Sequence, residues 1–246
     1  LAIAALYTSG AAHTQDSVQA SNLLTTCASP VASEGKRTLM CTFRASGPAE
    51  IEDVRARLEG ESADLTSRFE PFDAARQGST TYYLIQMLPK ARRATLAQMA
   101  DAVATIADQR EGLRRFTAYT FADELTPVAS SGVSRDAFVR QLIAIEPAAE
   151  PGGVLLHKAA EAAVKALAAE SGARKSLVIL ADGTSAEGDA TADAVVAAAR
   201  DAGVIIHALG YYDDTSERSK FEGLAKLATE TGGYAVEVKR GSGAKN

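Results

Sequence analysis

The spacing of apolar residues changes once along the chain, near residue 79. Before that point, apolar positions recur at every second residue, as at Leu39, Cys41, Phe43 and Ala45. A period of two with one apolar face is typical of half-buried antiparallel strands. We therefore expect a small antiparallel β unit of three or four strands over residues 16–78. So few strands are not stable alone, which predicts that the unit packs on another part of the protein.

From residue 79 to residue 240 the pattern alternates between short apolar segments and longer amphipathic ones. The segments predicted to be strands are 81–87, 116–121, 176–181, 204–209 and 234–238. Two contain continuous apolar runs, which is typical of parallel strands covered on both faces. A short edge strand near 125–128 is expected to run antiparallel. This alternation predicts an α/β fold: a doubly wound, mostly parallel sheet with helices on both faces.

Three amphipathic segments have the 3.6-residue period of helices. Their apolar faces are Leu96, Met99, Val103 and Ile106; Leu156, Ala159, Ala160, Ala163 and Leu167; and Phe221, Leu224 and Ala228. Ser134 is suited to cap a further helix that carries Phe138 and Leu142. Thr215 or Ser216 is expected to cap the last helix, and Gly232 to end it.

Composition and charge narrow the function classes. A net charge of −5 argues against a nucleic-acid-binding protein. The sequence contains no run of 18 apolar residues, so no membrane span is predicted. Residues 1–15 are apolar and then small, which is typical of the remnant of a secretory signal peptide, although a hydrophobic strand or a disordered end would look similar. We expect a secreted or periplasmic protein, and residues 241–246 form a flexible tail.

The chain contains two cysteines, Cys27 and Cys41. Both lie in extended, alternating segments that are able to pair as a hairpin. In an oxidising compartment a disulfide between them would contribute roughly 3 kcal/mol. The alternative is a pair of buried, reduced thiols.

Three segments carry the residues of greatest interest. The first predicted strand of the sheet ends in Gln86-Met87-Leu88-Pro89-Lys90, a glycine turn follows at Gly152-Gly153-Val154, and a later strand ends in Asp182-Gly183. Their order and spacing resemble the von Willebrand factor A family over residues ~80–240. The resemblance implies a metal-ion-dependent adhesion site at these loops, in which Asp-x-Ser-x-Ser, a Thr and an Asp bind Mg²⁺ through oxygen atoms.

The resemblance also implies that this site is degenerate here. Gln86 retains a neutral carbonyl oxygen, Leu88 has no ligand atom, and Lys90 brings an ammonium group to a hydroxyl position. Val154 replaces the Thr, so only Asp182 keeps its charge. One carboxylate and one amide oxygen are too few for magnesium. We therefore predict no cofactor and no metal, and an ion pair between Lys90 and Asp182 in the cation's place. The alternative is that Lys90 points to solvent and Asp182 caps the next turn.

Charged and aromatic residues surround these loops. Arg92 and Arg93 follow the first loop, and Tyr211, Tyr212 and Asp213 follow the strand at 204–209. Exposed tyrosines beside charges are common in protein-contact surfaces. An ordinary solvated loop rim would have the same composition.

The sequence contains no motif that identifies an enzyme. A nucleophile elbow and a phosphate-binding loop are both absent, and His207 is expected to be a structural residue of a strand. We therefore expect a non-catalytic, metal-independent module that binds another protein, in adhesion or complex assembly. The alternatives are a magnesium-dependent adhesion module with a weakened site, an unrecognised enzyme on a Rossmann-like scaffold, or a structural domain whose partner adds a strand to the N-terminal β unit.

Overall fold

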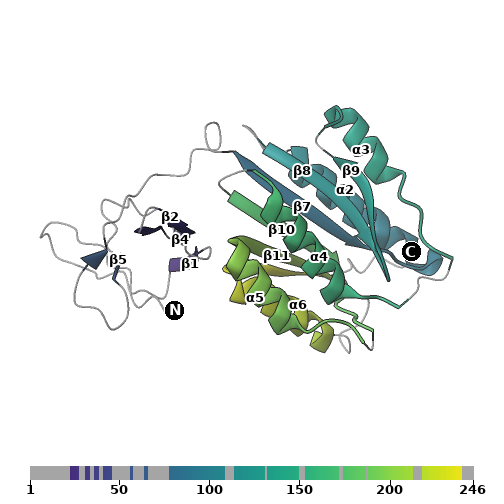
Figure 1. The fold of residues 1–246 in the computed structure, drawn as a ribbon. Coiled ribbons are helices and arrows are strands. Elements are labelled where there is room, and N and C mark those ends of the chain that lie inside the picture. The colour runs from purple at the N-terminus through teal and green to yellow at the C-terminus, as the bar shows by residue number, and fades with distance from the viewer. Residues whose placement is uncertain are drawn as a thin grey trace, which may run out of the picture. The chain divides into compact units, whose positions relative to one another are not determined.

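Figure 1 shows the fold of a computed structural model of the chain. The structure describes residues 78–108, 114–130, 132–149, 153–171, 174–186, 188–212 and 218–239, together with the backbone of six short strands between residues 23 and 65. Two compact units are present: Leu1–Thr25 with Phe43–Phe72, and Thr26–Thr42 with Asp73–Asn246. The predicted leader, the predicted tail and the two candidate N-caps of the last helix, Thr215 and Ser216, lie outside the described residues. Gly232, predicted to end that helix, follows its last residue Glu230 closely and has a left-handed φ of 81°.

The six N-terminal strands form three two-stranded sheets. The pairs are β1 (Leu23–Cys27) with β4 (Cys41–Ala45), β2 (Val31–Ser33) with β3 (Lys36–Thr38), and β5 (Ala56–Arg57) with β6 (Asp64–Leu65). The last two pairs are antiparallel, as the alternating pattern predicts. Cys27 and Cys41 lie on paired strands. Their side chains are outside the described part of the structure, so the disulfide stays a prediction.

The larger unit contains a six-stranded sheet, which confirms the predicted α/β class. Its order is β12-β11-β10-β7-β8-β9, and every neighbouring pair is parallel except β8 with β9. The bounds are β7 Ser79–Gln86, β8 Arg114–Phe121, β9 Leu125–Ser130, β10 Arg174–Ala181, β11 Val204–Tyr212 and β12 Ala235–Lys239. The antiparallel strand at the edge is the one predicted near 125–128.

Helices cover both faces of this sheet (Figure 1). On one face lie α2 (Arg93–Asp108) and α3 (Arg135–Ile143); on the other lie α4 (Leu156–Ala169), α5 (Ala192–Ala202) and α6 (Arg218–Glu230). Ser134 caps α3 as predicted, because its hydroxyl accepts a hydrogen bond from the Ala137 N–H. None of the helices in the described residues is long and apolar enough to cross a membrane.

The sequence reasoning missed α5. Its apolar face is formed by Val195, Val196 and Ala199, and alanine supplies little contrast with the polar face. Two local signals were nevertheless present. Thr191 accepts a hydrogen bond from the Ala194 N–H at the N-terminus, and Gly203 ends the helix with a left-handed φ of 65°. This is the usual asymmetry of helix ends, a hydroxyl at the start and a glycine after the end.

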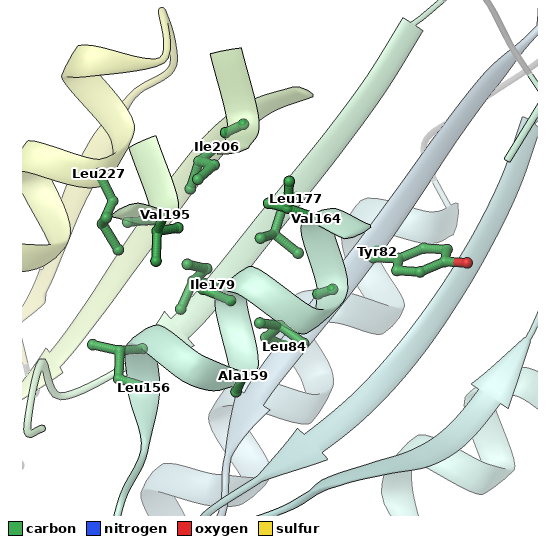
Figure 2. Packing of buried hydrophobic residues seen from close by; sticks show 14 of the residues in the cluster. Tyr82, Leu84, Leu156, Ala159, Val164, Leu177, Ile179, Val195, Ile206 and Leu227 are labelled. Atoms are coloured by element: carbon green, nitrogen blue, oxygen red, sulfur yellow. The ribbon is translucent and has the colours of Figure 1, made fainter. Parts of the chain in front are cut away.

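Two apolar layers form because successive strand residues point to opposite faces. Leu84, Leu177 and Ile179 pack beneath α4 and α5, against residues such as Leu156 and Val195 (Figure 2). Their strand neighbours pack in the opposite layer, with Met99 of α2 and Phe138 of α3 among others. These layers hold the carboxyl ends of the parallel strands in fixed positions.

Candidate functional site

The candidate site lies where the sheet reverses its winding direction. The central strand β7 lies between β8 and β10, and the helices that follow β7 and precede β10 cover opposite faces. In open α/β sheets, such a switch point at the carboxyl ends of the strands is where ligands bind. Gln86 ends β7 and Asp182 directly follows β10, in the register that places Leu180 opposite Ile85.

Arg92 forms the central contact of the site. Its Nη1 lies 2.5 Å from Asp182 Oδ2, and its Nη2 donates to the Tyr211 carbonyl oxygen at 3.0 Å. The two charged side chains are largely buried, 17% exposed for Arg92 and 8% for Asp182. One guanidinium therefore joins the loops that follow β7 and β10 to the last residues of β11.

Two further hydrogen bonds hold the chain around Asp182. The buried side chain of Gln86 accepts a hydrogen bond from the Asp182 backbone N–H, with Oε1 at 2.7 Å. The Thr184 backbone N–H donates to Asp182 Oδ1 at 2.9 Å. Gln86 thus binds the neighbouring loop directly, and both carboxylate oxygens of Asp182 have protein partners.

The pKa of Asp182 follows from these contacts. Burial by itself raises the pKa of the carboxyl group, because a charged form loses its hydration. Hydrogen bonds from the backbone and side chain of Thr184, from Gln86 and from Arg92 outweigh burial and lower the pKa below its ordinary value. The carboxylate is therefore ionised at neutral pH and balanced by the guanidinium.

The predicted ion pair between Lys90 and Asp182 is wrong. Lys90 is exposed, whereas Arg92 reaches the carboxylate. The reason is the short 3₁₀ turn η2 (Lys90–Arg92), which begins after Pro89 and brings position 92 toward the sheet. A guanidinium is also better suited to the position, because its planar fork binds a carboxylate and a carbonyl oxygen together. Arg92, expected at the rim, therefore lies at the centre of the site.

The other two predicted positions carry no ligand chemistry in the structure either. Leu88 is 1% exposed and packs in the apolar layer beneath α2. Val154 is half-buried against the opposite layer, and its carbonyl oxygen accepts a hydrogen bond from the Ala186 N–H at 2.7 Å. The structure thus brings Gln86, Val154 and Asp182 to the same end of the sheet, as the resemblance implies, but through protein–protein hydrogen bonds.

The residues present do not fit a divalent cation. A magnesium site needs several oxygen ligands with free lone pairs in octahedral positions. Here the Gln86 oxygen and both oxygens of Asp182 already accept hydrogen bonds, and a guanidinium lies against the carboxylate. Within the described residues there is also no group of three or more His, Cys, Asp or Glu side chains that could hold a metal ion.

Gly183 allows the loop after β10 to lie close to α6. Its φ is 83°, a left-handed value that side chains disfavour. A Cβ at this position would lie 2.3 Å from the Lys220 carbonyl oxygen, too close for any side chain. Gly183 is therefore required for this loop to pack against α6, whatever the site binds.

A second carboxylate in the same loop, Asp189, has a structural role that the sequence did not indicate. Asp189 accepts hydrogen bonds from the His157 and Lys158 backbone N–H groups at 2.8 and 2.9 Å, and from the Ser185 hydroxyl at 2.6 Å. His157 Nδ1 lies 3.1 Å from the same carboxylate. Asp189 thus caps the N-terminus of α4 from a distant loop. We call Ser185, His157 and Asp189 the α4 cap cluster.

The α4 cap cluster has a structural role, because its hydrogen bonds hold the loop after β10 against the start of α4. Burial raises the pKa of the Asp189 carboxyl, but hydrogen bonds from Ser185, His157, Lys158 and Ala190 lower it overall. Ser185 Oγ and Asp189 Oδ2 both lie near the same ring atom, Nδ1 of His157, at 3.2 and 3.1 Å. A nucleophile–base–acid relay needs the two partners on different ring nitrogens, so this arrangement does not activate Ser185.

The predicted rim is only partly at the surface. Arg93 is exposed and pairs with the exposed Glu146, with Arg93 Nη2 and Glu146 Oε1 3.0 Å apart. Tyr211, however, is 4% exposed, so the expectation of an exposed side chain there is wrong. It points into the layer beneath α2, where burial raises its pKa. The Tyr212 side chain and Asp213 lie outside the described residues.

Comparison with known proteins gives a family match. The profile of the von Willebrand factor type A domain matches residues 86–245. No curated protein matches the chain. Among solved structures, a conserved hypothetical protein BatB from Bacteroides thetaiotaomicron superposes with a TM-score of 0.52 at 15% identity, covering 66% of this chain and 90% of that one.

Two further solved structures have the same fold. An aerotolerance-related membrane protein from Bacteroides fragilis has a TM-score of 0.51 at 15% identity, covering 65% of this chain and 90% of that one. Proximal thread matrix protein 1 from the mussel byssus, with a zinc-occupied metal-ion-dependent adhesion site, has a TM-score of 0.50 at 17% identity and covers 65% and 41%. At such identities the likeness establishes the fold alone.

Proposed function

Because this chain belongs to the von Willebrand factor type A domain family, whose domains are protein-interaction and adhesion modules, we propose that it is a non-catalytic module that binds another protein without a metal ion. The loops that follow β7 and β10 are the proposed contact face. The observation that carries the proposal is the Arg92–Asp182 ion pair, with Gln86 bonded to the same loop.

The ion pair supports metal independence by taking over what a cation would do. A divalent cation between these loops would neutralise Asp182 and hold the loop ends together. Arg92 does both, because its guanidinium contacts Asp182 and also the Tyr211 carbonyl oxygen. The loop face is then preformed in the absence of any ion, which lowers the entropic cost of binding a partner.

Calorimetric titration with MgCl₂ and MnCl₂ tests metal independence. We expect no binding heat up to about 1 mM, the weak end of protein divalent-cation sites. The matched positive control is the variant Gln86→Asp, Leu88→Ser, Lys90→Ser, Val154→Thr and Arg92→Ala, which restores the oxygen ligands and removes the guanidinium. Micromolar binding by the unaltered chain would contradict the proposal and favour the magnesium-dependent alternative.

Partner capture tests the interaction role. The full chain, immobilised and exposed to an extract of its source, should retain the same protein with and without a chelator. Arg92→Ala should weaken retention, because the contact face loses its central tie, while Leu96→Met in the apolar layer should leave it unchanged. Loss of the partner in chelator would reject metal independence.

We further propose that the protein works outside the cytoplasm, in a secreted or periplasmic location. The support is the apolar and then small-residue character of residues 1–15 and the two cysteines Cys27 and Cys41. The solved relatives include a membrane protein and a byssal matrix protein. Alkylation and mass measurement of protein isolated from its source tests this: a disulfide between the two cysteines is expected, and two free thiols would contradict it.

A further inference from the structure

Two strands in the middle of the sheet begin with pairs of basic residues, at the end opposite the proposed contact face. Arg114 and Arg115 begin β8, and Arg174 and Lys175 begin β10. The central strand β7 lies between these two strands, and its first residue, Ser79, is in register with both Arg114 and Arg174. The chain as a whole has a net charge of −5. Local positive charge in an acidic protein indicates either structural ion pairs or an anionic ligand.

These basic residues divide between the two faces of the sheet, because successive residues of a strand point to opposite sides. Arg115 and Lys175 lie on the face that α4 covers. Arg114 and Arg174 lie on the opposite face, on which α2 packs, and Ser79 lies between them. Each face thus has one basic residue from β8 and one from β10, and the two faces can be compared.

On the face that α4 covers, both basic residues have partners within the chain. Arg115 Nη1 lies 3.7 Å from Glu170 Oε2. Lys175 Nζ donates to the Ala168 carbonyl oxygen at 2.6 Å. Glu170 also accepts a hydrogen bond from the Tyr82 hydroxyl, with Oε1 at 2.9 Å. These contacts hold the C-terminal end of α4 against β7, β8 and β10, so the basic residues of this face have a structural role.

On the opposite face, Arg114 differs from its neighbour Arg115 in its contacts. Arg114 is half-buried, and within the described residues no hydrogen bond or ion pair includes it, although its Nε atom is buried. A buried donor without an acceptor is unfavourable, and a cation without a counter-charge is more so. Arg174 has an interaction of its own within the chain, and it adds a second half-buried guanidinium group to this face. The described residues therefore supply no acceptor for Arg114, in a place that is already positive.

We propose that Arg114, Arg174 and Ser79 bind a tetrahedral oxyanion such as phosphate at the amino-terminal end of the sheet. Neighbouring strands lie about 4.8 Å apart, so the Cα atoms of the two arginines are separated by about 10 Å across Ser79. Long side chains on either side can therefore both reach one group above the serine. Guanidinium groups bind phosphate and carboxylate oxygens in pairs. A tetrahedral oxyanion has more acceptor oxygens than a carboxylate, so it can accept from both arginines and from the serine hydroxyl together.

Amide NMR spectra of the full chain, recorded during a titration with sodium phosphate at constant pH, test the site. Sodium chloride keeps the ionic strength constant, so that a change in screening does not contribute. We expect saturable shift changes at residues 79, 114 and 174, with half-saturation at about 1 mM or below. Phenyl phosphate then identifies the source of the group. Equal affinity assigns the phosphate group of a larger molecule, and at least tenfold weaker binding assigns the free ion.

Arg114→Ala and Arg115→Ala form a matched pair, because they remove neighbouring arginines from opposite faces. Arg114→Ala should weaken phosphate binding at least tenfold, whereas Arg115→Ala, which loses the ion pair with Glu170, should bind like the unaltered chain. Arg114→Gln, which removes the charge but keeps most of the side chain, replaces the alanine variant if that variant does not fold. Phosphate should also raise the melting temperature of the unaltered chain and of Arg115→Ala, but not that of Arg114→Ala. The absence of saturable shifts, shifts that follow ionic strength alone, or equal binding by the two alanine variants would each overturn the proposal.

Discussion

Two carboxylates in the loop between β10 and α5 solve the same problem in different ways. Asp182 and Asp189 are both buried, and both have a lowered pKa despite that burial. Asp182 accepts the Thr184 backbone N–H and has in addition a charged side-chain partner, the Arg92 guanidinium. Asp189 depends mostly on the backbone, because three of its hydrogen bonds come from the N–H groups of His157, Lys158 and Ala190.

The difference shows which of the two sites depends on a single side chain. Backbone donors at a helix N-terminus are supplied by any sequence that forms the helix. A guanidinium is supplied by one residue and lost with one substitution. The contacts of Asp189 therefore depend mostly on the helix itself, whereas the ion pair of Asp182 depends on the residue at position 92. Four tests address this comparison.

The largest effect is expected from Arg92→Ala. It leaves the Asp182 carboxylate buried without its cation, and removing one partner of a buried pair costs about 3 kcal/mol. Arg92→Lys should recover part of this loss, because it keeps the charge but not the fork that also reaches Tyr211. Chemical denaturation of both variants measures the free energies of unfolding.

Arg93→Ala is the matched control for this test. It removes the neighbouring arginine, whose ion pair with Glu146 is exposed on both sides. Exposed pairs contribute less than about 1 kcal/mol. Equal losses in Arg92→Ala and Arg93→Ala would show that the Asp182 region is not held by its ion pair, and the contrast with Asp189 would fail.

Asp189→Ala is expected to cost less, about 2 kcal/mol, the upper end for the loss of a helix N-cap. The exposed backbone donors of α4 are able to bind water in the variant, which limits the loss. Asp189→Asn keeps one acceptor oxygen, so its free energy of unfolding should lie between those of Asp189→Ala and the unaltered chain. Hydrogen exchange of the first turn of α4 is the more specific measurement: faster exchange confined to that turn supports the capping role, and uniform change across the sheet contradicts it.

Acid should destabilise the protein through both carboxylates. Because their folded pKa values lie below those of the unfolded chain, their contribution is fully present above the unfolded value of about 4 and is lost as the pH falls through the folded values. Thermal melting between pH 6 and pH 2.5 should show this decline. Asp189→Asn should flatten the profile. An unchanged slope in that variant would mean that Asp189 has no lowered pKa in the folded state.

The sequence predicted the sheet well and the site only in outline. Apolar periodicity is a property of many residues together, so it located all six strands of the large sheet and the covering of β10 on both faces. The partner of Asp182 depends on a single turn of backbone. The short turn η2 decides whether the side chain at position 90 or at position 92 points inward, and no periodic pattern of apolar residues predicts such a turn. Asp189 was missed for a related reason, because its partners are backbone groups of a helix that begins 33 residues earlier, at Leu156.

The smallest effect is expected from Ser185→Ala, which tests whether the contacts of Asp189 are purely structural. Ser185 is exposed, and its hydroxyl donates to Asp189 Oδ2, so its loss should cost about 1 kcal/mol as a single hydrogen bond.

The residue types of the α4 cap cluster are those of a hydrolytic triad, yet the hydroxyl proton is directed to the carboxylate and the imidazole contacts both partners through one nitrogen. A serine held in this way is no nucleophile. We therefore expect neither the unaltered chain nor Ser185→Ala to react with a fluorophosphonate probe, as read by intact mass. Labelling that is lost in Ser185→Ala would instead reveal an enzyme, and would show that this cluster does more than hold the start of α4.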